Sequence, residues 1–297
     1  MNNLNLTDEL ILTIFNELSN PSKEIKIPKT FIQKILFKLK NDFEEDKTLV
    51  NSIPFYWYNH GPFSEPIRDS LNKLVSEDFL KIDPVNEYYV LNKDIRLRSN
   101  DYEEDIIKLL RKFSIYNLEK LIDDVYFNDA PFEFIPLYKR EMLEPLEKKI
   151  AQSDKEYFKE SIDLDELIDL LYDCESELPF DPIFNGYSRI FSNFTSILDN
   201  IYEEIDYINF IKSANIIKLM WYTFTKGLRI AEHEDAVIYN IQEISWKEKY
   251  FSKIAKTEKD MEFLKDIERE SCKNEYIIYP EKSKNLLLST VGTYLFD

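Results

Sequence analysis

The stretch "YWYNHGPFSEPIRDSLNKLVSEDFLKI", from Tyr56 to Ile82, determines how this chain is expected to fold. Three aromatic residues lead into a Gly-Pro turn. Ser64 then stands where a helix N-cap is preferred, and Pro66 fits the first turn, where its missing N–H costs little. The apolar residues that follow recur at helical spacing: Ile67, Leu71, Leu74 and Val75. The stretch therefore predicts a helix entered through a tight turn.

Two further helices precede this stretch and a hairpin follows it. Residues 7–19 and 29–42 each carry an apolar stripe at helical spacing, and Thr7 is the predicted N-cap of the first helix. Apolar and polar residues alternate on both sides of "DPVNE" (residues 83–87), which predicts a β-hairpin. The predicted fold is mainly α: an N-terminal winged helix, made of three helices plus a β-hairpin, followed by a C-terminal all-helical domain.

The predicted winged helix ends near residue 98, so we expect a domain boundary there. The predicted domains are residues 1–98 and an acidic helical domain, residues 99–297, with a sub-boundary near 151–160 or 178–188. Within the second domain, Asp206 is a predicted N-cap for a helix that ends at Gly227. The last segment, residues 275–297, predicts a short hairpin and a tail.

Glycine is scarce, and this excludes a large class of enzymes. The chain has 4 glycines in 297 residues, where average usage predicts about twenty. Loops that cradle phosphates need clustered glycines, because the backbone must approach the ligand closely. Neither GxGxxG nor GxxxxGK[ST] is present, so nucleotide enzymes of those types are excluded.

Charge is distributed unevenly along the chain, whose formal net charge is −18. Residues 1–98 hold 13 Lys and Arg against 15 Asp and Glu, whereas residues 99–297 hold 25 against 41. An acidic surface repels phosphate, so any contact with nucleic acid is expected from the first part. The acidic second part is suited to a basic protein partner or to dimerisation.

The remaining composition predicts a cytoplasmic protein that needs no cofactor or metal. Two cysteines and two histidines are too few and too scattered for a structural zinc site, and reduced thiols are expected in the cytosol. The most apolar run, residues 207–224, contains Lys212 and Lys218, so we expect no membrane association.

The two histidines allow a catalytic and a structural interpretation. His60 is a candidate general base or metal ligand, yet no recognisable partner lies near it in the sequence, and ring packing at a helix-entry turn is favoured. His233 lies among Glu232, Glu234 and Asp235, which suggests a divalent cation; a solvated helix start is favoured, because consecutive helical residues point in different directions.

The candidate DNA contacts lie on the second and third helices. The predicted DNA-binding residues are Lys29, Lys34, Lys38, Ser64, Arg68, Asn72 and Lys73. Lysines contact phosphates, and Arg68, Asn72 and Lys73 are types that hydrogen-bond base edges or phosphates. Glu65 and Asp69 on the same third helix oppose the approach of phosphate. A lysine-coated amphipathic helix without a DNA role is the alternative interpretation of residues 23–40.

Residues 58–82, "YNHGPFSEPIRDSLNKLVSEDFLKI", resemble the core of winged-helix regulators: a turn, a recognition helix and a strand leading into the wing. The "GPFS" segment with its leucine-spaced helix is also similar to SocA-like (Panacea) antitoxin domains. This resemblance implies a non-enzymatic regulator or antitoxin, with Ser64, Arg68, Asn72 and Lys73 on the reading helix.

The sequence leaves three functional hypotheses. The first is a non-enzymatic regulatory protein that binds duplex DNA through its winged helix and forms a homodimer. The second is an interaction, scaffold or antitoxin-like protein whose winged helix binds protein instead of DNA. The third is an enzyme of unfamiliar type, suggested only by His60 among aromatic residues.

Overall fold

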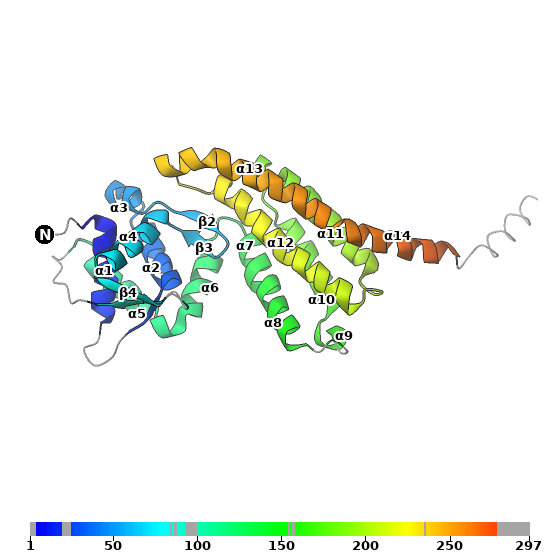
Figure 1. The fold of residues 1–297 in the computed structure, drawn as a ribbon, viewed down its shortest axis with the longest axis horizontal. Helices are drawn as coiled ribbons and strands as arrows, with labels where there is room; N and C mark the ends of the chain where they lie inside the picture. The colour runs from blue at the N-terminus through cyan, green and yellow to red at the C-terminus, as the bar shows by residue number, and fades with distance from the viewer. Residues whose placement is uncertain are drawn as a thin grey trace, which may run out of the picture. The chain divides into compact units, whose positions relative to one another are not determined.

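The computed structural model describes residues 4–19, 25–83, 85, 88–92, 100–153, 155, 158–234 and 236–277. Within these residues the protein is mainly helical, with two small antiparallel sheets (Figure 1). The chain divides into two compact units, residues 1–141 with 224–250, and residues 142–223 with 251–297. This division differs from a boundary near residue 98, because helices beyond that position pack on the N-terminal helices.

Three helices form the centre of the first unit: α1 (Leu6–Leu18), α2 (Lys29–Asp42) and α4 (Glu65–Ser76). Their apolar stripes meet, as the helical spacing predicts. The fully buried residues at this meeting include Leu10, Ile14, Ile32, Leu36, Leu71 and Leu74.

The start of α1 differs from the prediction by two residues. Asn5, not Thr7, is the N-cap: its side chain accepts a hydrogen bond from the Asp8 amide at 2.8 Å, and the Asp8 carboxylate accepts one from the Asn5 amide at 3.0 Å. Thr7 instead donates its hydroxyl to the carbonyl of Ser52 at 3.1 Å. A reciprocal capping box satisfies two helix-terminal donors, which a lone threonine cannot do.

Asp8 also joins α1 to α4. Its side chain is fully buried, and its Oδ2 accepts a hydrogen bond from Lys73 Nζ at 2.6 Å. A buried carboxylate is costly unless a charged partner compensates it. Lys73 is that partner, and this contact, led by its hydrogen bond, raises the pKa of Lys73.

A three-stranded antiparallel sheet packs beside these helices. Its order is β1-β5-β4, formed by β1 (Ile27–Pro28), β5 (Tyr88–Leu91) and β4 (Leu80–Asp83). The hairpin predicted around residues 83–87 is confirmed by the β4–β5 pairing, in which Leu80 opposes Leu91 and Asp83 opposes Tyr88.

Two elements between α2 and α4 were not predicted. The first is a short helix, α3 (Lys47–Ser52), whose N-cap Asp46 accepts hydrogen bonds from the Thr48 and Leu49 amides. The second is an antiparallel hairpin of β2 (Tyr56–Tyr58) and β3 (Gly61–Phe63). The aromatic run is therefore a strand, and Asn59 and His60 form the turn that connects it to β3.

Further helices complete the first unit. They are α5 (Glu103–Lys112), η1 (Ile115–Asn117), α6 (Leu118–Asn128), α7 (Phe134–Pro136) and the beginning of the π-helix η2 (Leu137–Leu143). The end of α12 (Tyr207–Ala231) and the start of α13 (Val237–Asp260) also belong to it. Both α5 and α6 pack on α2.

The second unit consists of helices in the described part of the chain. They are α8 (Glu144–Gln152), α9 (Phe158–Ser161), α10 (Leu164–Ser176), η4 (Pro182–Phe184), α11 (Asn185–Ile201), α14 (Glu262–Ile277) and the remaining parts of η2, α12 and α13. Helix α11 packs against both α10 and α14. Its buried side chains include Phe191 and Phe194.

Two predictions for the second half of the chain concern the helix that begins after Asp206 and the hairpin over residues 275–297. Asp206 accepts a hydrogen bond from the Asn209 amide at 2.8 Å, as an N-cap does, but the helix does not end at Gly227: α12 continues to Ala231. Packing overrides the preference of glycine for helix ends. Of the hairpin predicted over 275–297, the first three residues belong to α14 and the others lie outside the described residues.

Candidate functional site

The N-terminal end of α4 is fixed by a side chain from α2. The buried amide of Gln33 donates to the Ser64 carbonyl at 3.0 Å and accepts from the Ser64 amide at 2.9 Å. Ser64 is the N-cap residue of α4, but its hydroxyl makes no capping hydrogen bond, and the residue is buried. Ser64 therefore connects α2 to the start of α4 and is buried inside the protein.

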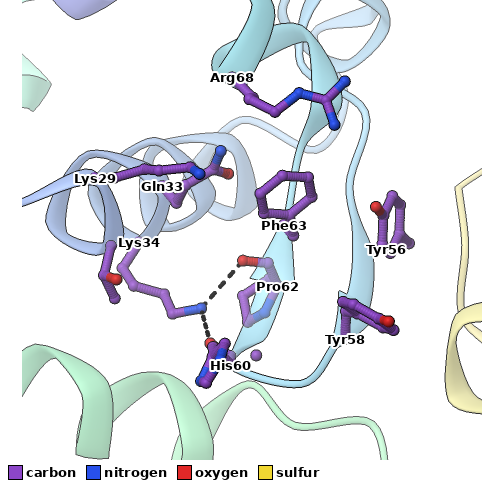
Figure 2. A pocket seen from close by; sticks show the side chains of 11 residues that line it. Lys29, Gln33, Lys34, Tyr56, Tyr58, His60, Pro62, Phe63 and Arg68 are labelled. Carbon is purple, nitrogen blue, oxygen red and sulfur yellow. Dashed lines mark hydrogen bonds between the residues drawn. The ribbon is translucent and has the colours of Figure 1, made fainter. Parts of the chain in front are cut away.

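Lys34 is also buried, although it was predicted to contact DNA. Its Nζ donates to the carbonyls of His60 at 2.6 Å and Pro62 at 3.1 Å (Figure 2). Gly61 lies between these carbonyls with φ +83°, and a Cβ at that position would lie 2.7 Å from Lys34 Nζ. The Asn-His-Gly-Pro turn thus closes around the lysine ammonium.

Burial lowers the pKa of Lys34 to about 7. The cause is desolvation, which disfavours the charged form of an amine. The two carbonyls offer only partial negative charge. No carboxylate from the described ranges is paired with this ammonium.

Two more of the predicted DNA contacts are paired with aspartates. Lys38 bonds to Asp124 and, at 2.6 Å, to Asp129, and its side chain is 11% exposed. Burial lowers the pKa of Lys38, but the hydrogen bonds and charges of these two aspartates outweigh it, so the pKa is raised. Lys73 compensates the buried carboxylate of Asp8.

The remaining predicted contacts are accessible. Asn72 is exposed on α4, and Lys29 at the start of α2 is partly exposed. Arg68 is partly exposed too, and its guanidinium lies 2.9 Å from the Asp69 carboxylate. Of the seven residues predicted, Lys29, Arg68, Asn72 and also Lys73, whose side chain is 34% exposed, therefore keep surface in contact with solvent.

A pocket of about 300 Å³ is lined by α2, the β2–β3 hairpin and the first turn of α4. Three cationic residues line it, Lys29, Lys34 and Arg68. Its aromatic lining comes from Tyr56, Tyr58 and Phe63. Figure 2 shows Phe63 and Pro62 between Arg68 at one end and the Lys34 ammonium at the other.

Tyr56 and Tyr58 of β2 belong to a group of packed aromatic and cationic side chains. The Arg229 guanidinium lies 4.3 Å from the ring centre of Trp246 and 5.0 Å from that of Tyr58. Tyr56 packs against Trp246 and Tyr239, with ring centres 5.2 Å and 5.1 Å apart. Cation–π contacts of this kind stabilise an arginine that is partly removed from water.

The two histidines lie in different surroundings. His60 is exposed and contributes its carbonyl to Lys34. His233 lies within 3.0 Å of the Ile230 carbonyl through Nδ1 and packs edge-on against Trp246. Glu234 bonds to Lys40, and no group of three potential metal ligands gathers among the residues described.

The start of α13 has two apolar faces. Tyr239, Trp246 and Tyr250 are buried against the protein. On the opposite face, Val237, Ile241 and Ile244 are 77%, 74% and 73% exposed. Their spacing of four and three residues places them in one stripe along the helix.

Comparisons with known proteins identify no relative. The chain matches no protein-family model, and neither a curated protein nor a solved structure is significantly similar to it. Across the ranges that the structure describes, every helix is too short or too polar to cross a membrane.

Sequence reasoning missed the β2–β3 hairpin, the pocket and the outer face of α13. The hairpin had a signal, because "YWY" and "GPF" flank a two-residue turn with a glycine beside it. Isoleucines at 241 and 244 are also visible as a stripe, but only the structure shows that another face of α13 is buried. Whether a lysine on an amphipathic helix lies inside or outside depends on which segments cover it.

We predict that Gly61→Ala lowers the free energy of unfolding by more than about 1 kcal/mol, because alanine is strained at positive φ and its Cβ would collide with Lys34 Nζ. Gly186→Ala is the control: Gly186 lies in α11, and a Cβ there would meet Ile254 at an ordinary 3.4 Å. Urea denaturation of both variants measures the difference. Equal stability of the two variants would contradict the tight closure of the turn.

We predict that Lys34 makes stability depend on pH in the alkaline range. Its pKa is about 7 in the folded protein and near the ordinary 10.5 when unfolded, so the unfolded state binds more protons between these values. The free energy of unfolding of the wild type, relative to Lys34→Met, should therefore rise with pH over this window, by at most about 1.4 kcal/mol per pH unit. Denaturation at several pH values tests this, and a constant difference would refute it.

Proposed function

We propose that this protein is a non-enzymatic regulatory protein that acts by binding another protein chain. Its N-terminal unit is, in this proposal, a winged helix used as an interaction module. The order of α1, α2 and α4 followed by the β4–β5 hairpin supports the winged helix. Because a fold alone does not define a function, we infer the kind of partner from the residues exposed at the surface.

The observation that carries the proposal is the exposed stripe on α13. Large apolar side chains that are contiguous and exposed mark sites of protein association, since covering them removes apolar surface from water. Val237, Ile241 and Ile244 form such a stripe on a helix whose other face is already buried.

The distribution of cations favours protein over DNA as partner. DNA binding requires lysines and arginines free to neutralise phosphates. Lys34 is buried, Lys38 bonds to two aspartates and is 11% exposed, and Lys73, although partly exposed, bonds to the buried carboxylate of Asp8. Accessible Arg68 has Asp69 beside it on α4, and this carboxylate also opposes phosphate.

A second copy of the same chain is the partner we assign to the α13 stripe. The net charge of −18 opposes self-association over most of the surface. Between residues 237 and 245 the helix has one charged residue, Glu243, and it is paired with Lys247. Two copies can therefore approach here without strong repulsion, and a spacing of four and three residues is the one that packs helix against helix.

We predict that the wild-type protein is a dimer and that Ile241→Asp with Ile244→Asp yields a folded monomer. Both side chains are more than 70% exposed, so the charges are tolerated in the monomer but not in an apolar interface. Size-exclusion chromatography with light scattering measures the mass, and circular dichroism confirms folding.

Asn240→Asp with Ser245→Asp is the matched control, because it adds the same charge at exposed polar positions of α13 and should weaken the dimer less. A wild type that stays monomeric at every concentration, or a double aspartate variant that stays dimeric, would contradict the assignment.

Duplex DNA is the second candidate partner, favoured by the accessibility of Lys29, Arg68 and Asn72. In this case binding to a mixed-sequence duplex should appear in a gel shift at low salt and fall steeply as salt rises. Arg68→Glu should weaken it, whereas Lys108→Glu on α5 should have a smaller effect. Absence of a shift at low salt excludes this candidate.

A further inference from the structure

We propose that the pocket between α2 and the β2–β3 hairpin binds a small organic anion with a planar apolar body. The proposal concerns a site separate from the α13 stripe and does not depend on the proposed function. It rests on the charge, burial and shape of the pocket.

The lining has the opposite charge to the rest of the protein. The chain holds 56 Asp and Glu against 38 Lys and Arg. Of the eleven residues that line the pocket in the described part of the chain, three are cationic and none is acidic. A concave site lined by one sign of charge concentrates ligands of the other sign.

Lys34 gives the pocket a charge that the protein itself does not neutralise. Its side chain is 2% exposed and its partners are the carbonyls of His60 and Pro62. Two carbonyl dipoles do not replace a full counter-charge. The lowered pKa of Lys34 has the same cause, and an anion bound in the pocket would stabilise the ammonium form.

Arg68 and Lys29 supply the more accessible cations of the site. Arg68 presents a planar fork suited to a carboxylate. Its present contact with Asp69 is a surface ion pair, which is weak enough to exchange for a ligand, and Glu65 lies 4.0 Å away on the same helix. Lys29 Nζ lies 5.9 Å from the ring centre of Phe63, so cation and aromatic surface are adjacent.

The aromatic side chains define the body of the ligand. Phe63 lies between Arg68 and the Lys34 ammonium (Figure 2), and Tyr56 and Tyr58 also line the pocket. A volume of about 300 Å³ lies at the small end of the range for small-molecule sites. A compact planar group fits this space, and its ring can stack on the aromatic lining.

The experiment compares 2-naphthoate with its neutral analogue 2-naphthamide by isothermal titration calorimetry on the full chain. We expect naphthoate to bind at least about tenfold more tightly, because the pocket offers cations to its carboxylate. The double variant Lys29→Gln, Arg68→Gln should remove this preference. Both positions are partly exposed, so the variant is expected to fold, and Lys81→Gln on exposed β4 surface is the control.

The outcomes separate this site from the α13 stripe. Naphthoate binding that survives Ile241→Asp and is lost in the Lys29, Arg68 double variant supports the pocket. Equal affinity for the two probes, no binding of either, or binding lost in Ile241→Asp but kept in the double variant would overturn it. Failure of the pocket leaves the dimer measurement unaffected, so the two proposals are tested independently.

Discussion

Two neighbouring residues of α2 hold the first unit together at its centre. The Gln33 amide makes both hydrogen bonds to the backbone of Ser64, and the Lys34 ammonium bonds to the carbonyls on either side of Gly61. These backbone groups are partly or wholly buried and need partners, because an unpaired buried polar group costs about 1 to 3 kcal/mol. One turn of α2 therefore fixes the β2–β3 hairpin and the direction in which α4 leaves it.

The same contacts determine what remains at the surface. Lys34 is buried and Lys38 is 11% exposed and bonds to Asp124 and Asp129, whereas Lys73 bonds to Asp8 but stays partly exposed. The surface keeps a partly exposed arginine on α4, a pocket with cationic lining and an apolar stripe on α13. This arrangement is the basis of our proposals of association through apolar surface and recognition of a small anion.

Periodicity made the main elements predictable. Helices α1, α2 and α4 lie where apolar residues recur at helical spacing, and the β4–β5 hairpin lies where they alternate. The candidate site was less predictable. Lys34 and Lys38 have the same local appearance as any lysine on an amphipathic helix. Their environment comes from the hairpin, Asp124 and Asp129, whose contacting residues are 26 to 91 residues away in sequence. Side-chain burial by distant segments leaves no local signal.

The sequence by itself determined that the chain is mainly helical, that "GPFS" leads into a helix, and that glycine-rich phosphate loops are absent. Tertiary structure decided the rest. It made "YWYNHGPF" a hairpin whose turn encloses a lysine, and it placed Trp246 and Arg229 beside Tyr56. It also buried one face of α13 and left Ile241 and Ile244 exposed. The physical reason is that helical spacing specifies which residues share a face, whereas only packing specifies which face is covered.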